Sequence, residues 1–75
     1  MKPTVQFKNN CIAVITKSDT VVLYDSDLVG MLKESESRAE FCNKVYDYFS
    51  SEFEEPLNYK EISDAAKRFY KNFSS

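Results

Sequence analysis

The side chains that could carry chemistry in this chain are carboxylates, thiols and hydroxyls, because none of its 75 residues is His. A catalytic triad, a His general base and a zinc site built on imidazole are therefore excluded within this sequence. The carboxylates between residues 52 and 55 lie beside Pro56, where solvent is close, so they indicate a solvated acidic surface rather than an acid–base pair. Ser18 and Ser37 have no base to activate them, and a turn and a helix cap explain both. We expect no catalytic residues and no enzymatic activity.

The two cysteines and the single glycine exclude further kinds of site. Cys11 and Cys42 cannot supply the four ligands of a structural metal site, and one glycine cannot build a phosphate-binding loop. A reactive thiol needs a cationic, partly exposed setting, which nothing in the sequence fixes around either cysteine. We therefore expect free thiols that pack as small apolar side chains, with no metal and no cofactor.

The length and the apolar pattern indicate the class of protein. A chain of this length predicts a single domain, residues 1–75, with a small core. The longest apolar run, Cys11–Ile15, is far shorter than a membrane span, and the N-terminus lacks the apolar block of a signal peptide. We therefore expect a cytoplasmic protein with no membrane partner.

The charge is unevenly distributed along the chain. Residues 34–55 carry seven acidic and two basic side chains, whereas residues 56–75 carry two acidic and four basic ones. The net charge of −2 argues against a nucleic-acid footprint, which requires a basic surface. The chain therefore has an acidic middle and a mildly basic end.

Alternation with a period of two predicts three strands in the first third of the chain. They lie at about residues 4–8, 11–16 and 20–24. The pair Asn9-Asn10 suits a two-residue hairpin turn because Asn tolerates positive φ. Short turns join such strands into an antiparallel meander, whose first and third strands are edges unless something covers them.

In the rest of the chain the apolar period changes to 3.6 and predicts three helices. They lie at about residues 27–34, 38–53 and 59–73. Ser26 or Asp27 can cap the first helix, while Ser37 and Asn58 can cap the other two. The expected apolar stripes of the two longer helices are Phe41, Val45, Tyr48, Phe49 and Phe53, and Ile62, Ala65, Ala66, Phe69 and Phe73. The fold class is therefore α+β, a three-stranded antiparallel β-meander followed by three helices that cover one face.

The third expected strand carries no residue that blunts an edge. Val21 and Leu23 point to one face and Val22 and Tyr24 to the other, and Thr20–Tyr24 contains no Lys, Pro or Gly. An extended peptide can add to such an edge, with backbone hydrogen bonds giving affinity and side-chain pockets giving specificity. The alternative, in which this strand is central, stays open because sequence determines strand order poorly.

Four segments of the chain resemble one family in their spacing. They read Lys2-Pro3-x-Val5-x-Phe7-Lys8, Ile12-Ala13-Val14, Thr20-Val21-Val22-Leu23 and Leu28-Val29-Gly30-Met31-Leu32. Together with the helices at 40–53 and 61–73, this pattern is similar to that of PqqD-like domains. These domains are the precursor-peptide recognition elements in the biosynthesis of ribosomally synthesised, post-translationally modified peptides. The resemblance covers nearly the whole chain.

The resemblance implies a winged-helix-like fold and a non-catalytic role. In this family the leader segment of a precursor peptide adds to the third strand, lies against the third helix and is delivered to a partner modifying enzyme. Carried over by position, the binding residues are Thr20, Val21, Val22, Leu23 and Tyr24 on the strand, and Ala65, Lys67, Arg68, Phe69, Asn72 and Phe73 on the helix.

The resemblance also suggests how each partner is bound. Arg68 and Lys67 are expected to meet carboxylates of an acidic peptide, chiefly affecting the association rate. The acidic middle helix, on which Glu40, Tyr46 and Asp47 are expected to be exposed, is the candidate surface for the enzyme.

Two other classes of protein stay open. The first is a winged-helix nucleic-acid-binding protein, although the acidic chain makes nucleic acid a poor partner, and titration with duplex DNA at low salt tests it. The second is a small phage-type inhibitor or interaction protein acting through its acidic face. Loss of partner capture on mutating the middle helix, with no effect of Val22→Pro, would favour this second class. The basic and amide residues that keep the first class open are Lys60, Lys67, Arg68, Lys71 and Asn72.

Overall fold

The computed structural model describes residues 3–74, which form a three-stranded sheet followed by three helices. The elements are β1 (Thr4–Lys8), β2 (Cys11–Ile15), β3 (Thr20–Leu23), α1 (Asp25–Lys33), α2 (Arg38–Glu52) and α3 (Tyr59–Ser74). The predicted α+β class and the order of its elements are confirmed, and every predicted boundary lies within two residues of the observed one.

The sheet is an antiparallel meander with β2 in the centre and β1 and β3 at its edges. The strand at Thr20–Leu23 is therefore an edge strand, which decides the alternative that the sequence leaves open. Its register aligns two rows of apolar side chains on the face that the helices cover. These rows are Val5–Val14–Val21 and Phe7–Ile12–Leu23. Because side chains alternate between faces, Ala13 and Val22 point away from the helices.

Local signals at the ends of the elements are confirmed at three places. The turn Asn9-Asn10 has φ angles of 54° and 60°, the left-handed pair that a two-residue type I′ hairpin turn requires. Glu40 N–H donates to Ser37 Oγ at 3.1 Å, and Glu61 N–H donates to Asn58 Oδ1 at 3.2 Å. Ser37 and Asn58 are therefore the caps of α2 and α3.

α1 begins earlier than predicted because neither Ser26 nor Asp27 is its N-cap. Tyr24 takes that position, and its N–H donates to an Asp27 carboxylate oxygen at 3.3 Å. Asp27 is thus the third helical residue, reaching back to the cap as an acidic side chain does in a capping box. As a result, the first turn of α1 follows directly on the end of β3.

Replacing Ser37 with Ala is expected to lower the free energy of unfolding by about 1 kcal/mol, because Glu40 N–H loses its side-chain acceptor. Ser37→Asp keeps an acceptor and is expected to stay within about 0.5 kcal/mol of the wild type. Urea denaturation followed by circular dichroism measures both variants. Equal losses for the two variants would show that the cap does not stabilise α2.

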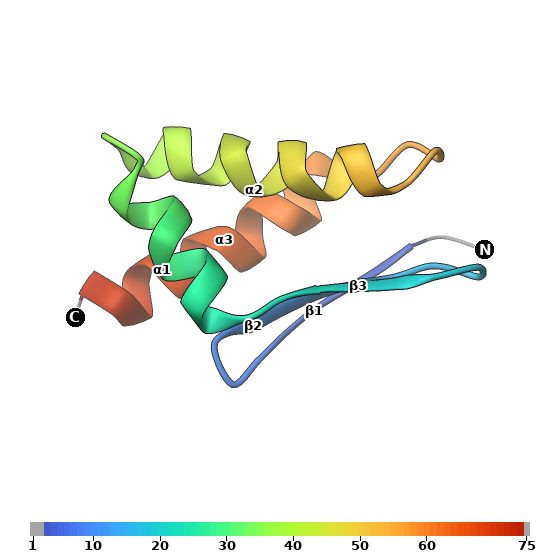
Figure 1. Cartoon of the computed structure of the whole chain (residues 1–75), viewed down its shortest axis with the longest axis horizontal. Helices are drawn as coiled ribbons and strands as arrows, with labels where there is room; N and C mark the ends of the chain where they lie inside the picture. The colour runs from blue at the N-terminus through green and yellow to red at the C-terminus, as the bar shows by residue number, and fades with distance from the viewer. Residues whose placement is uncertain (1–2, 75) are drawn as a thin grey trace.

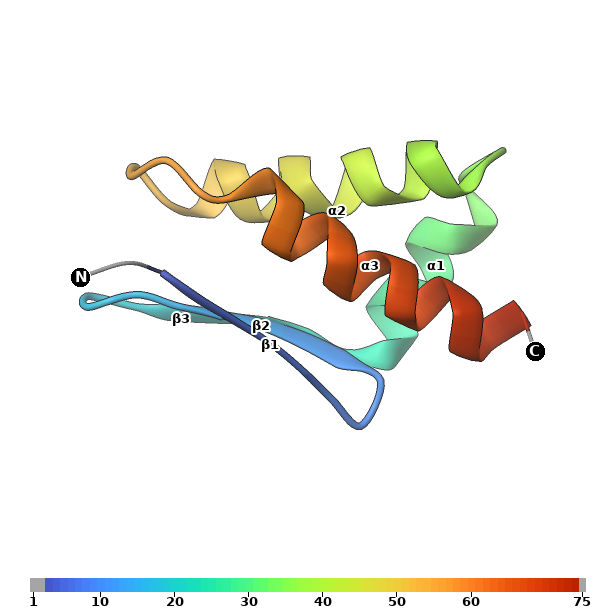
Figure 2. The ribbon, with the colours of Figure 1, turned by 180° about the vertical axis from the view of Figure 1, so that it is seen from behind.

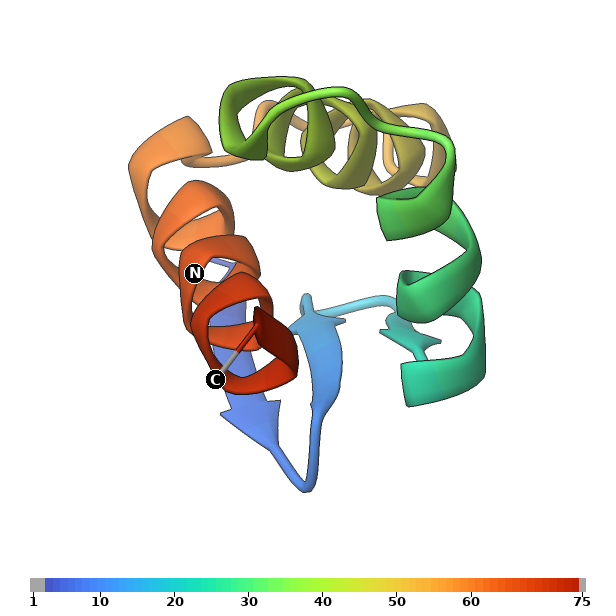
Figure 3. The ribbon, with the colours of Figure 1, turned by 90° about the vertical axis from the view of Figure 1, so that its left-hand side faces the viewer.

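The three helices lie on one face of the sheet (Figure 1). Viewed along the long axis, α2 lies farthest from the sheet, α3 lies on the β1 side and α1 on the β3 side (Figure 3). α3 packs against α2, β1 and β2. The most deeply buried side chains between the layers are Phe41, Phe49, Ile12, Leu28, Ile62, Val14, Val45 and Cys42.

Two residues expected on the buried stripes are instead exposed. Tyr48 of α2 is 37% exposed and Phe73 of α3 is 50% exposed, so these two predictions are wrong. Phe73 lies in the last turns of α3, where its ring stacks on Phe69 with centroids 6.1 Å apart. Tyr48 faces a cavity beside β3, which is part of the candidate site.

Candidate functional site

β3 presents one edge that has no neighbouring strand within residues 3–74. Thr20 N–H donates to the Asp19 carboxylate at 2.8 Å, so it does not point at β2. Tyr24 N–H likewise donates to the Asp27 carboxylate, at 3.3 Å. Backbone groups of a strand alternate sides with a period of two, so the N–H and C=O of Val22 also point away from β2. We name this side of β3 the open edge.

The turn between β2 and β3 fixes this alternation. Thr16 N–H donates to the C=O of Asp19 at 2.8 Å, and Asp19 N–H donates back to Thr16 Oγ1 at 3.1 Å. Counting from Asp19 in steps of two residues, the backbone N–H and C=O groups of Val21 and Leu23 also face β2. Val22 is therefore the residue at the centre of the open edge whose N–H and C=O are both directed outward.

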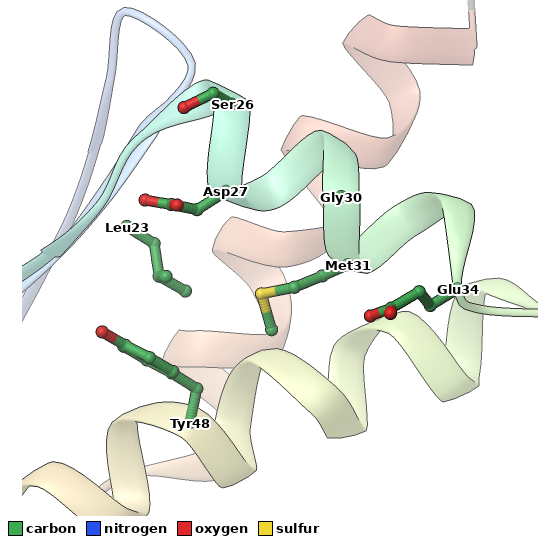
Figure 4. Close-up of a pocket in the computed structure, with 7 residues that line it drawn as sticks. All are labelled: Leu23, Ser26, Asp27, Gly30, Met31, Glu34 and Tyr48. Atoms are coloured by element: carbon green, nitrogen blue, oxygen red, sulfur yellow. The ribbon is translucent and has the colours of Figure 1, made fainter.

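A cavity of about 450 Å³ adjoins the α1 end of the open edge. Leu23 from β3, Met31 from α1 and Tyr48 from α2 point toward a common space (Figure 4). We name this the Leu23 cavity. Its lining residues are Leu23, Ser26, Asp27, Gly30, Met31, Glu34 and Tyr48.

A second cavity, of about 330 Å³, adjoins the other end of β3, where the β2–β3 turn meets the end of α2. We name it the Asp19 cavity. Its lining residues are Ser18, Asp19, Glu52, Phe53, Glu54 and Glu55. Both cavities lie between β3, or the turn before it, and α2. The wall beside the open edge is therefore formed by α2 and α1.

The structure does not bring the predicted strand residues together with Ala65 and Arg68 of α3. α3 runs over β1 and β2, toward the edge of the sheet opposite to the open edge (Figure 2). Ala65 and Arg68 line a cavity of about 500 Å³ together with Val5 and Phe7 of β1. The predicted strand residues and these two helix residues therefore lie at opposite edges of the sheet.

The other predicted residues of α3 lie in the core, near the start of α1 and on the surface. Phe69 is buried, with its ring centroid 5.9 Å from that of Phe41. Asn72 and Phe73 line a cavity of about 320 Å³ together with Phe69, Asn10 of the β1–β2 turn, and Asp25 and Val29 of α1. This end of α3 therefore lies near the start of α1. Lys67 is exposed. None of these side chains lines either cavity beside the open edge.

The edge of β1 is less suited to strand addition than the open edge. β1 follows Pro3 and ends at Lys8, and Pro and Lys are residues that blunt the edges of natural sheets. The cavity between β1 and α3 also mixes charges, since Arg68 lines it with Glu61 and Asp64. The open edge of β3 is therefore the better candidate.

Sequence reasoning missed the residues of α1 and α2 that wall the open edge. Tyr48 occupies a core position in the helical pattern, and only its exposure in the fold makes it available to a ligand. Met31 also fits the buried side of a short helix, yet it lines the Leu23 cavity. The acidic character of residues 34–55 is a signal for this wall, but it fits the predicted surface for a partner enzyme equally well.

The predicted enzyme surface on α2 is only partly available. Tyr46 was expected to be exposed, but it is half-buried, with its ring 5.1 Å from that of Tyr59. The Tyr59 hydroxyl donates to Asn43 Oδ1 at 2.6 Å, so this pair of rings joins α2 to α3. Asp47 is exposed, and Glu40 is half-buried with a carboxylate oxygen 4.0 Å from Lys44 Nζ.

Both cysteines are free thiols, as expected. Cys42 is buried in α2, where its Sγ lies 3.8 Å from the C=O of Ser63. Cys11 is half-buried at the start of β2, so the expectation of burial holds fully only for Cys42.

No protein-family model matches the chain, and no curated protein and no solved structure matches it either. Among residues 3–74, no group of three or more Cys, Asp or Glu side chains is arranged to hold a metal ion. None of the helices in this part of the chain combines the length and the apolar character that crossing a membrane requires.

Proposed function

We propose that this protein is a non-catalytic peptide-binding module that captures an extended segment by strand addition at the open edge of β3. The observation that carries this proposal is the outward direction of the Val22 N–H and C=O, on an edge strand without Lys, Pro or Gly. Main-chain bonds to such an edge give affinity that depends little on sequence.

The Leu23 cavity supports a second component of recognition. Side chains of an added strand alternate between faces, so every second one points to the helix-covered side, where Val21 and Leu23 point. There it meets the space between Leu23, Met31 and Tyr48. An aromatic side chain such as Tyr48 supplies contact area and a hydroxyl partner at little entropic cost. Specificity would then come from the residue that enters this cavity.

The biological form of this function, which rests on the resemblance to PqqD-like domains, is leader capture. The domain holds the leader of a ribosomal precursor peptide and presents the rest of that peptide to a modifying enzyme. Tethering of this kind raises the local concentration of the modified segment to about millimolar when the linker is short and flexible. The domain itself makes and breaks no covalent bond.

Peptide selection followed by amide mapping tests the proposal. Random dodecapeptides displayed on phage are selected on the immobilised full chain, and synthetic copies are titrated into ¹⁵N-labelled protein. The largest amide shifts are expected from Thr20 to Tyr24 and around the Leu23 cavity, because main-chain bonds form there. A selection that yields no binder, or shifts centred on β1 and α3, would overturn strand addition at β3.

A further inference from the structure

We propose that the segment added to β3 is basic, with Lys or Arg at two helix-facing positions four residues apart. This inference rests on the proposed function, and it adds the chemistry of the partner. It also reverses the expectation of an acidic peptide, because the side chains that wall the open edge are acidic.

The two cavities beside the open edge carry carboxylates and no cation among their lining residues. All six of these carboxylate residues are exposed. They are Asp27 and Glu34 in the Leu23 cavity, and Asp19, Glu52, Glu54 and Glu55 in the Asp19 cavity. The cavity on the opposite edge differs, since it contains Arg68.

These carboxylates have no cationic partner within residues 3–74. The ion pairs in this part of the chain join Lys44 to Glu40 and Lys60 to Asp64. Asp19 and Asp27 each accept one backbone N–H, which leaves further lone pairs on both side chains. None of the six carboxylates is therefore neutralised by an ion pair in this part of the chain.

The spacing of the two acidic groups sets the spacing of the cations. Asp19 and Leu23 mark the two cavities and are four residues apart, about 13 Å along a strand. The side chains of both residues point to the same face as Val21. The side chains of an added strand that lie opposite these residues therefore also point toward the helices. A segment reading Lys-x-Val-x-Lys would set its apolar residue opposite Val21 and one cation at each cavity.

The same charges disfavour a second copy of this chain as the occupant. Pairing two open edges would bring two acidic walls together, in a protein whose net charge is already −2. Like charges placed across an interface oppose association. A basic peptide is instead attracted by these carboxylates, which raises both its association rate and its affinity.

Three synthetic peptides test the inference. Their common core is X-Thr-Val-Thr-X flanked by Thr, and X is Lys, Gln or Glu. At low salt the Lys peptide is expected to bind about tenfold or more tightly than the Gln peptide, and the Glu peptide more weakly than both. In 0.5 M NaCl the differences are expected to shrink, because screening shortens the range of the charges. Amide titrations measure the dissociation constants and locate the site.

A matched pair of variants assigns the effect to the wall of the open edge. E52Q/E54Q/E55Q removes three charges that line the Asp19 cavity. It is expected to weaken binding of the Lys peptide about fivefold and to leave the affinity for the Gln peptide unchanged. E36Q/E61Q/D64N removes the same charge from residues outside both cavities, and it is expected to change binding less than twofold.

Each outcome decides one of the two proposals. If all three peptides shift Thr20–Tyr24 with equal affinity, or if both triple variants weaken the Lys peptide equally, the basic partner is overturned and strand addition stands. If no peptide binds, or if the Lys peptide shifts residues other than the open edge, strand addition itself is overturned. A stronger affinity for the Glu peptide at the open edge would restore the acidic partner.

Discussion

Replacing Phe41 with Ala is expected to lower the free energy of unfolding by about 3–5 kcal/mol, the usual cost of deleting a buried ring and leaving a cavity. Phe41 is fully buried and joins α2 to α3, with ring centroids 5.9 Å from Phe69 and 6.3 Å from Tyr70. A chain of this length has a total stability of about 4–11 kcal/mol, so the variant is expected to lose a large share of its folded population. Thermal unfolding should show a fall in Tm of about 12 °C or more.

Phe73→Ala is the matched control for this loss. This substitution also removes a phenyl ring that packs on Phe69, with the two ring centroids 6.1 Å apart, but Phe73 is half exposed. Its cost is expected to be below about 1.5 kcal/mol, since less apolar area returns to water. If the two variants lost the same stability, the contact between α2 and α3 would not depend on the buried Phe41 ring.

Proline substitutions at Val22 and Val21 are expected to have opposite consequences. Val22→Pro removes an N–H that points outward, so β3 keeps its bonds to β2 while the docking bond is lost. Binding of the selected peptides is expected to fall at least about tenfold, with little change in Tm. Val21→Pro removes an N–H that faces β2 and is expected to cost about 2–4 kcal/mol of stability.

Circular dichroism and peptide titration together separate these two effects. The pair differs by one position in the same four-residue strand, so composition and side-chain size are matched. Full peptide affinity in a folded Val22→Pro variant would rule out main-chain docking at β3. A folded Val21→Pro variant would contradict the direction assigned to the backbone groups of β3.

The elements of this fold could be predicted because their signals are local. Asn9-Asn10 identifies a tight turn through its tolerance of positive φ, and Ser37 and Asn58 mark helix starts through acceptors three residues before the bonded N–H. The start of α1 was predicted less well. Its N-cap is Tyr24, which offers no short side-chain acceptor, and the recognisable acidic residue is three positions later.

The candidate site could be predicted only in part, because its walls depend on packing between distant segments. The apolar pattern of α3 identifies the face that is buried, including Ala65 and Phe69, but it does not say which strands that face covers. Because α3 lies over β1 and β2, the side chains beside the open edge come from α1 and α2 instead. Tyr48 and Asp27 consequently belong to the site, whereas Arg68 belongs to the opposite edge.

The two carboxylates bound at the ends of β3 also bear on behaviour in concentrated solution. The N–H groups of Thr20 and Tyr24 already donate to Asp19 and Asp27, so of the outward N–H groups at residues 20–24 that of Val22 alone is open to an added strand. Because one open N–H offers few bonds to each added copy, we expect β3 to be a poor template for a ribbon that grows into fibrils. Asp19 and Asp27 thereby limit the hydrogen bonds that β3 offers to further copies of this chain.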